Sequence, residues 1–70
     1  IDLIHLKEKW PRYIVSREKI RDFTGGALSP GRLANLDSSG EGPQRFKIGR
    51  KIVYPVDSLV QWLENRSEML

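Results

Sequence analysis

Four basic side chains crowd one short stretch in the second half of the chain, and together they have the chemistry to bind a polyanion. They are Arg45, Lys47, Arg50 and Lys51. No acidic residue interrupts the stretch, so each cation is available to neutralise a phosphate, and each phosphate contact adds about −0.9 to the salt slope of duplex DNA binding. The alternative is that these charges only protect the edge of a sheet from aggregation.

A second group of polar side chains has the spacing to read base edges. Arg32 and Asn35 lie three residues apart near the start of an expected helix, and such side chains match guanine and adenine edges in the major groove. Ser29 is expected to cap that helix and to be near a phosphate, with Ser39 as a further exposed polar residue and Arg17 as a contact to the DNA backbone. The alternative is that these are solvated surface residues.

The net charge of +3 is unevenly distributed along the chain. Residues 17–54 contain eight bases and four acids, whereas residues 55–70 contain one base and three acids. The electrostatic field of such a charge distribution attracts a polyanion to one part of the surface. The absence of cysteine excludes disulfides and thiolate metal sites and favours the cytoplasm, and no apolar run approaches the roughly 18 residues of a membrane span.

Catalytic and metal chemistry is poorly represented. His5 and Glu8 are spaced to ligate a metal, but two ligands make a poor site. No nucleophile is paired with a base by spacing, and no glycine-rich phosphate loop is present. We therefore expect no enzyme activity, no metal and no cofactor.

The length of 70 residues predicts one domain over 1–70, with a short arm at 1–11 that ends at Pro11. A brief β-favouring run at 13–15 precedes Ser16, which is a candidate N-cap. The first helix then points Ile20 and Phe23 inward and ends at Gly25 and Gly26.

A second helix is expected after Ser29 as N-cap and Pro30 at the first helical position. Leu33 and Leu36 face inward, and the Ser- and Gly-rich stretch 37–43 forms a loop. Two short helices joined by a glycine-containing turn match the helix-turn-helix signature, although any pair of antiparallel helices shares much of it.

Residues 45–48 and 51–54 predict a β-hairpin around a type II′ turn at Gly49. Phe46 and Ile48 then share one face of the hairpin, and Arg45 and Lys47 share the other.

A last helix follows Pro55 and covers the core. Its inward residues are Val56, Leu59, Val60 and Leu63. The aromatic residues Phe23, Phe46, Tyr54 and Trp62 are expected in the core, because a domain this small needs its aromatics inside, and only Trp10 and Tyr13 are expected exceptions.

The string at 46–54, followed by Asp57-Ser58-Leu59 and Trp62-Leu63-Glu64, resembles the excisionase-like or AlpA-like family, whose members are related to MerR-type DNA-binding domains. The resemblance covers about residues 12–66. It implies an α+β, mainly α fold of the winged helix-turn-helix type: a helix-turn-helix, a β-hairpin wing and a C-terminal helix. It also implies that residues 29–39 enter a major groove and that the wing at 45–51 contacts the backbone or a minor groove.

The expected function is therefore sequence-specific binding of double-stranded DNA, as a phage or mobile-element excisionase-like factor or as a transcriptional regulator. One module buries only about 600 to 1,000 Å² on DNA, so a second copy, a recombinase or RNA polymerase is an expected partner. The first alternative is a winged-helix adaptor that binds proteins without reading bases. The second is a protein that binds single strands or RNA, with bases stacked on Trp10 and Tyr13.

Overall fold

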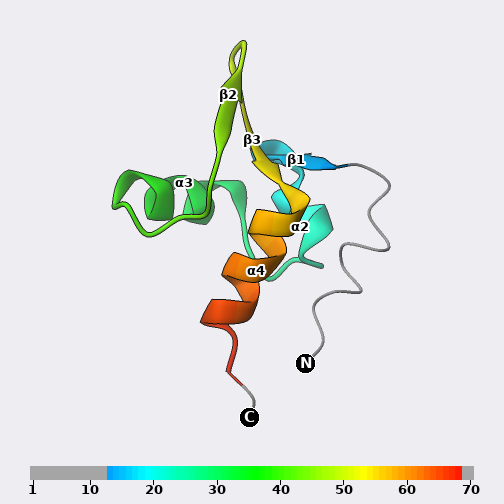
Figure 1. The fold of residues 1–70 in the computed structure, drawn as a ribbon, viewed down its shortest axis with the longest axis vertical. Coiled ribbons are helices and arrows are strands. Elements are labelled where there is room, and N and C mark those ends of the chain that lie inside the picture. The colour runs from blue at the N-terminus through cyan, green and yellow to red at the C-terminus, as the bar shows by residue number, and fades with distance from the viewer. Residues whose placement is uncertain (1–12, 69–70) are drawn as a thin grey trace.

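The computed structural model describes residues 13–68, which form a mixed α+β fold of three α-helices and a three-stranded antiparallel sheet (Figure 1). The elements in chain order are β1 (Ile14–Ser16), the 3-10 turn η1 (Arg17–Lys19), α2 (Ile20–Phe23), α3 (Pro30–Ser38), β2 (Phe46–Ile48), β3 (Lys51–Pro55) and α4 (Val56–Arg66). The expected arm at 1–11, including His5, Glu8 and Trp10, lies outside the described residues.

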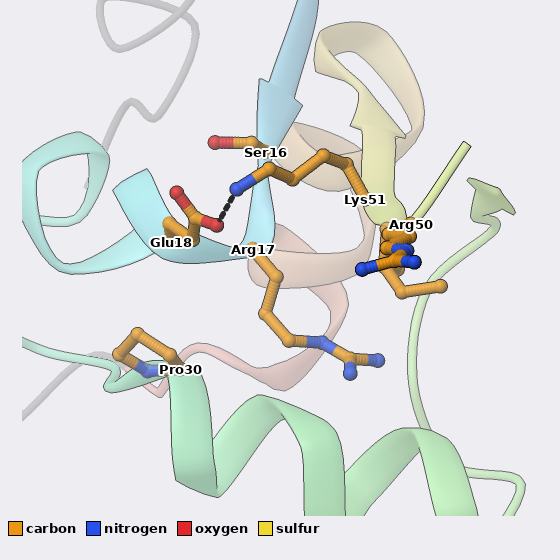
Figure 2. A pocket seen from close by; sticks show the side chains of 7 residues that line it. Ser16, Arg17, Glu18, Pro30, Arg50 and Lys51 are labelled. Carbon is orange, nitrogen blue, oxygen red and sulfur yellow. Dashed lines mark hydrogen bonds and ion pairs between the residues drawn. The ribbon is translucent and has the colours of Figure 1, made fainter. Parts of the chain in front are cut away.

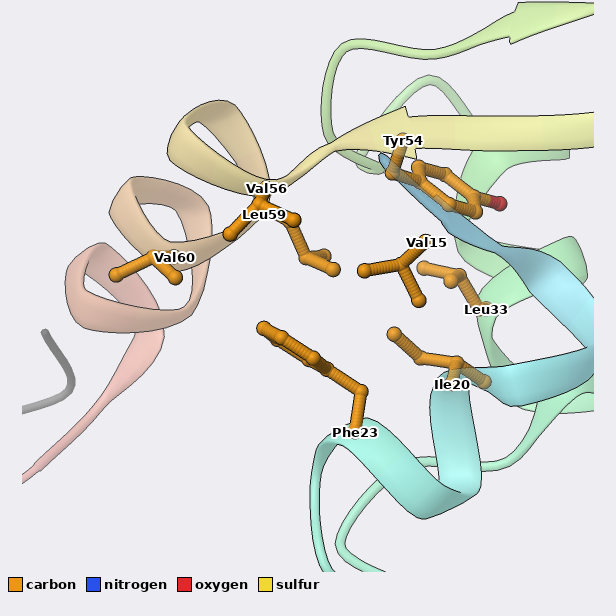
Figure 3. Close-up of a cluster of buried hydrophobic side chains, with 8 residues drawn as sticks. All are labelled: Val15, Ile20, Phe23, Leu33, Tyr54, Val56, Leu59 and Val60. Atoms are coloured by element: carbon orange, nitrogen blue, oxygen red, sulfur yellow. The ribbon is translucent and has the colours of Figure 1, made fainter. Parts of the chain in front are cut away.

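The core lies between the helices and one face of the sheet (Figure 3). Strand β3 is the central strand, and Tyr54 on it is paired with Val15 on β1, so these two side chains share the inner face. Both are fully buried. The other buried members of the cluster are Ile20, Phe23, Leu33, Val56, Leu59 and Val60.

The expected first helix is present as η1 followed by α2, with Ile20 and Phe23 buried as predicted. Ser16 occupies the N-cap position, as predicted, but its side chain accepts no capping hydrogen bond. The reason is that the first turn is a 3-10 turn entered directly from β1, and Ser16 is itself the last strand residue, paired with Val53.

Helix α3 begins as predicted. Ser29 is the N-cap, its hydroxyl accepts a hydrogen bond from the Arg32 backbone N–H at 3.1 Å, and Pro30 is the first helical residue. Leu33 and Leu36 are buried. The helix runs to Ser38, one residue beyond Asp37, so Asp37 is a buried helix residue and was wrongly placed at the start of a loop.

The hairpin of β2 and β3 has a two-residue turn at Gly49 and Arg50. Gly49 has a φ of 61° and Arg50 does not have a positive φ, which is the pattern of a type II′ turn. Strand β3 continues to Pro55, which pairs with Ile14, so Pro55 is the last residue of the strand and does not interrupt it.

The hairpin does not bury Phe46, which is 51% exposed, and its prediction as a core residue was wrong. Phe46 pairs with Val53 on the outer face of the sheet, and the inner face is filled by Tyr54 and Val15. Alternation defines two faces but does not say which one meets the helices. Tyr13 is 93% exposed, as expected.

Helix α4 packs Val56, Leu59 and Val60 against the core, with Leu63 and Trp62 partly buried beside them. The Trp62 indole N–H donates to the Glu41 carbonyl at 2.9 Å, which ties the loop after α3 to α4. Across residues 13–68, no helix has the length and apolar character needed to cross a bilayer.

Candidate nucleic-acid interface

A cavity of about 160 Å³ lies between the start of α3 and the turn of the hairpin (Figure 2). Pro30 lines it from α3, Arg50, Lys51 and Ile52 line it from the hairpin, and Ser16, Arg17 and Glu18 line it from the β1–η1 segment. The two elements predicted to contact DNA are therefore neighbours across one concave surface.

On α3, the two candidate base-reading residues are both exposed. Arg32 and Asn35 lie on the solvent side of the helix, while Leu33 and Leu36 face the core. Neither exposed side chain has a hydrogen-bond or ion-pair partner among residues 13–68. The Ser29 cap uses the backbone N–H of Arg32 and not its side chain, so the cap leaves the Arg32 guanidinium available for a ligand.

Ser39 has a local role at the opposite end of α3. It is the C-cap residue, and its hydroxyl donates to the Leu36 carbonyl at 2.9 Å. The same hydroxyl lies 3.4 Å from a Glu41 carboxylate oxygen. These contacts engage the Ser39 hydroxyl within the protein.

The hairpin presents three exposed cations. Lys47 and Arg50 have no ion-pair partner within the described part of the chain, whereas Lys51 is paired with the Glu18 carboxylate. Lys51 and Glu18 are both mostly exposed, with side-chain exposures of 58% and 62%. This pair lowers the pKa of Glu18, chiefly through the hydrogen bond from Lys51 and then through its charge.

The remaining two candidates, Arg17 and Arg45, are drawn to the buried carboxylate of Asp37. Arg17 Nη2 donates to Asp37 Oδ2 at 2.6 Å, and Arg17 Nε donates to the Tyr54 hydroxyl at 3.0 Å. Arg45 is more exposed, with Nη1 at 3.7 Å from Asp37 Oδ1 and Nη2 at 3.4 Å from the Asp37 carbonyl. Both arginines therefore help to hold α3 in place, in addition to any contact with a ligand.

Asp37 was missed by sequence reasoning, yet it connects most of the site. Its Oδ2 accepts hydrogen bonds from Arg17 on η1 and, at 2.5 Å, from the Tyr54 hydroxyl on β3. Asp37 is only 5% exposed, so this carboxylate is stabilised by its donors and not by water. The only sequence signal was its position four residues after Leu33, on the inward side of the helix.

The Asp37 cluster perturbs the titration of its neighbours. Burial, followed by the hydrogen bond to Asp37, raises the pKa of Tyr54 to about 12. Burial alone would lower the pKa of Arg17, but its hydrogen bonds with Tyr54 and Asp37 raise it overall. Tyr54 therefore stays protonated and Arg17 charged at neutral pH, which is the state that these hydrogen bonds require.

Within residues 13–68, no group of three or more histidine or acidic side chains is arranged to hold a metal ion. The site as described consists of cations, a polar helix face and a concave surface between them.

Comparisons with protein-family models, with curated proteins and with solved structures found no match.

Proposed function

We propose that the chain binds double-stranded DNA as a winged helix-turn-helix module of the excisionase-like kind. Helix α3 lies in the major groove with Arg32 and Asn35 toward base edges, and the β2–β3 hairpin contacts the backbone through Lys47, Arg50 and Lys51. In this role the protein assists a recombinase or regulates transcription, and a second copy or another protein on the DNA increases its affinity.

One observation carries this proposal: the start of α3 and the tip of the hairpin line the same cavity, with exposed cations on both elements. A duplex that touches one element therefore meets the other. The Asp37 hydrogen bonds support the same conclusion, because they join α3 to β3 and keep the helix and the hairpin in a fixed relation.

A gel-shift assay with flanking genomic DNA tests the proposal. Arg32→Ala removes one exposed guanidinium and leaves the Ser29 cap intact, because that cap uses the backbone N–H. We expect it to reduce discrimination between specific and mixed-sequence duplexes by about 1–3 kcal/mol. Arg50→Ala/Lys51→Ala should weaken binding to both duplexes and make the salt dependence shallower by about 2 × 0.9.

The control is Arg66→Ala, which removes an exposed cation on α4 that lies 5.0 Å from the Trp62 ring, remote from the hairpin tip. It should leave the DNA affinity within a factor of about two. If duplex binding by the parent protein does not fall steeply between low and moderate salt, the DNA proposal fails.

A second candidate function is favoured by the outer face of the sheet. Ile14, Phe46 and Ile48 lie on this face and are 43%, 51% and 58% exposed. Exposed apolar side chains gathered on one face are typical of protein contacts. An adaptor that binds another protein through this face would retain its binding at moderate salt and lose it in a Phe46→Ser/Ile48→Ser variant.

A further inference from the structure

The cavity between α3 and the hairpin contains three cations in three different states. The Arg17 guanidinium is engaged by Asp37 and Tyr54. Lys51 is engaged by Glu18, the one acidic side chain that lines the cavity (Figure 2). Arg50 has no ion-pair partner within residues 13–68. The cavity therefore offers one cation without an ion-pair partner among the described residues, Arg50, one cation paired with a buried carboxylate, Arg17, and one paired with an exposed carboxylate, Lys51.

The cavity has the size for an oxyanion. A cavity needs a volume of about 10–15 Å³ to hold a single water. The volume of this cavity is about 160 Å³, which leaves room for a tetrahedral phosphate group. Pro30 is the α3 residue at its edge, and proline has no backbone N–H to donate. Pro30 therefore supplies no N–H donor to the cavity, and the cationic side chains that line it are the groups suited to hold an anion here.

Breaking the Glu18–Lys51 ion pair costs little free energy. Both side chains are more than half exposed, and ion pairs between exposed side chains contribute little to stability. Lys51 is a flexible point charge, and it can move from a carboxylate to a phosphate without disturbing the β3 backbone.

We propose, on the basis of the DNA binding proposed above, that this cavity binds one backbone phosphate of the duplex and that Glu18 competes with this phosphate for Lys51. In the free protein Glu18 holds Lys51. On binding, Lys51 and Arg50 contact the phosphate, and Glu18 is released to solvent, where a counterion replaces Lys51. Glu18 thus lowers the affinity for DNA backbone and limits non-specific binding.

The test is a double-mutant cycle on the full chain, with a labelled mixed-sequence duplex as the probe. Glu18→Gln should tighten binding about two- to fivefold at low salt, and the gain should shrink as salt rises. In a Lys51→Gln background the same substitution should give less than half of that gain, because the residue it competes for is missing.

Asp22→Asn is the matched control. Asp22 is an exposed acid on α2 that does not line the cavity, and its substitution changes the net charge by the same amount. A gain with Asp22→Asn equal to that with Glu18→Gln would overturn the proposal, as would a gain that persists in Lys51→Gln. Thermal melting of each variant verifies that it is folded.

Two further outcomes separate this inference from the function on which it rests. If the parent binds DNA but Glu18→Gln binds no tighter, only the competitor role is lost. If neither binds duplex DNA, the proposed function fails and this inference with it. In NMR titrations of the free protein at constant ionic strength, duplex DNA should shift the Arg50 and Lys51 signals at a much lower concentration than inorganic phosphate does. Binding of inorganic phosphate at these signals that is as tight as the binding of duplex DNA would assign the cavity to free phosphate and overturn its assignment to the DNA backbone.

Discussion

The hydroxyl of Tyr54 on β3 donates a hydrogen bond to the buried carboxylate of Asp37 on α3, at 2.5 Å, across 17 positions of the chain. Arg17 donates to both groups. This cluster joins the helix proposed to enter the groove to the strand that carries the proposed wing. Its integrity should therefore affect both stability and DNA binding.

Replacement of Asp37 by Asn should destabilise the protein by about 2–4 kcal/mol, because it leaves the Arg17 guanidinium without its charged partner in a partly buried place. Urea denaturation followed by tryptophan fluorescence measures the change. Tyr54→Phe is the comparison: it removes one hydroxyl, keeps the Arg17–Asp37 pair and should cost about 1–2 kcal/mol. Equal stability of Asp37→Asn and the parent would show that the pair contributes nothing.

Alkaline pH should destabilise the protein through Tyr54. Its pKa in the folded protein, about 12, is above the ordinary value of 10.0, so the unfolded chain loses the tyrosine proton first. The stabilisation is fully present below pH 10 and is lost as the pH rises toward 12. In Tyr13→Phe, Tyr54 is the only tyrosine, and ultraviolet absorbance of tyrosinate follows it directly. A midpoint at the ordinary value would contradict the buried hydrogen bond.

Gly42 should not tolerate a side chain. A Cβ at this position would lie 1.8 Å from Asp37 Oδ1 and 3.1 Å from Asp37 Cα, so the loop after α3 would have to move away from the helix. We expect Gly42→Ala to cost about 1–3 kcal/mol in thermal or urea unfolding. Gly31→Ala is the matched control, because Gly31 has open space around it within α3 and alanine favours a helix by up to about 1 kcal/mol. A similar effect of both substitutions would refute the close approach.

Substitution on the outer face of the sheet should separate stability from function. Phe46→Thr and Ile48→Thr each remove a side chain that is about half exposed, and threonine is well suited to strands. The free energy of unfolding should therefore change by less than about 1 kcal/mol for each substitution. DNA affinity should remain within a factor of about two, as measured by fluorescence anisotropy. A large loss of DNA affinity would place this face in the DNA contact.

Local signals in the sequence determined the ends and turns of several elements. Ser29 and Pro30 start α3 because a hydroxyl cap followed by proline suits a helix start, and the cap hydrogen bond is present. Gly49 sets the hairpin because its positive φ favours glycine. The spacing of Ile20, Phe23 and Leu33 identified residues that are buried. These features depend on neighbouring residues, so they can be inferred without knowing the fold.

Tertiary structure alone decided which face of the sheet is covered and where the buried charge lies. Phe46 and Ile48 alternate with cations, yet the helices cover the face of Tyr54 and Val15 and leave Phe46 half exposed. Asp37 precedes serines and a glycine and resembles a loop residue, but Arg17 and Tyr54, 20 and 17 positions away, supply the donors that allow its burial. The cost of burying a carboxylate depends on partners that are distant in sequence, and only the folded chain brings them together.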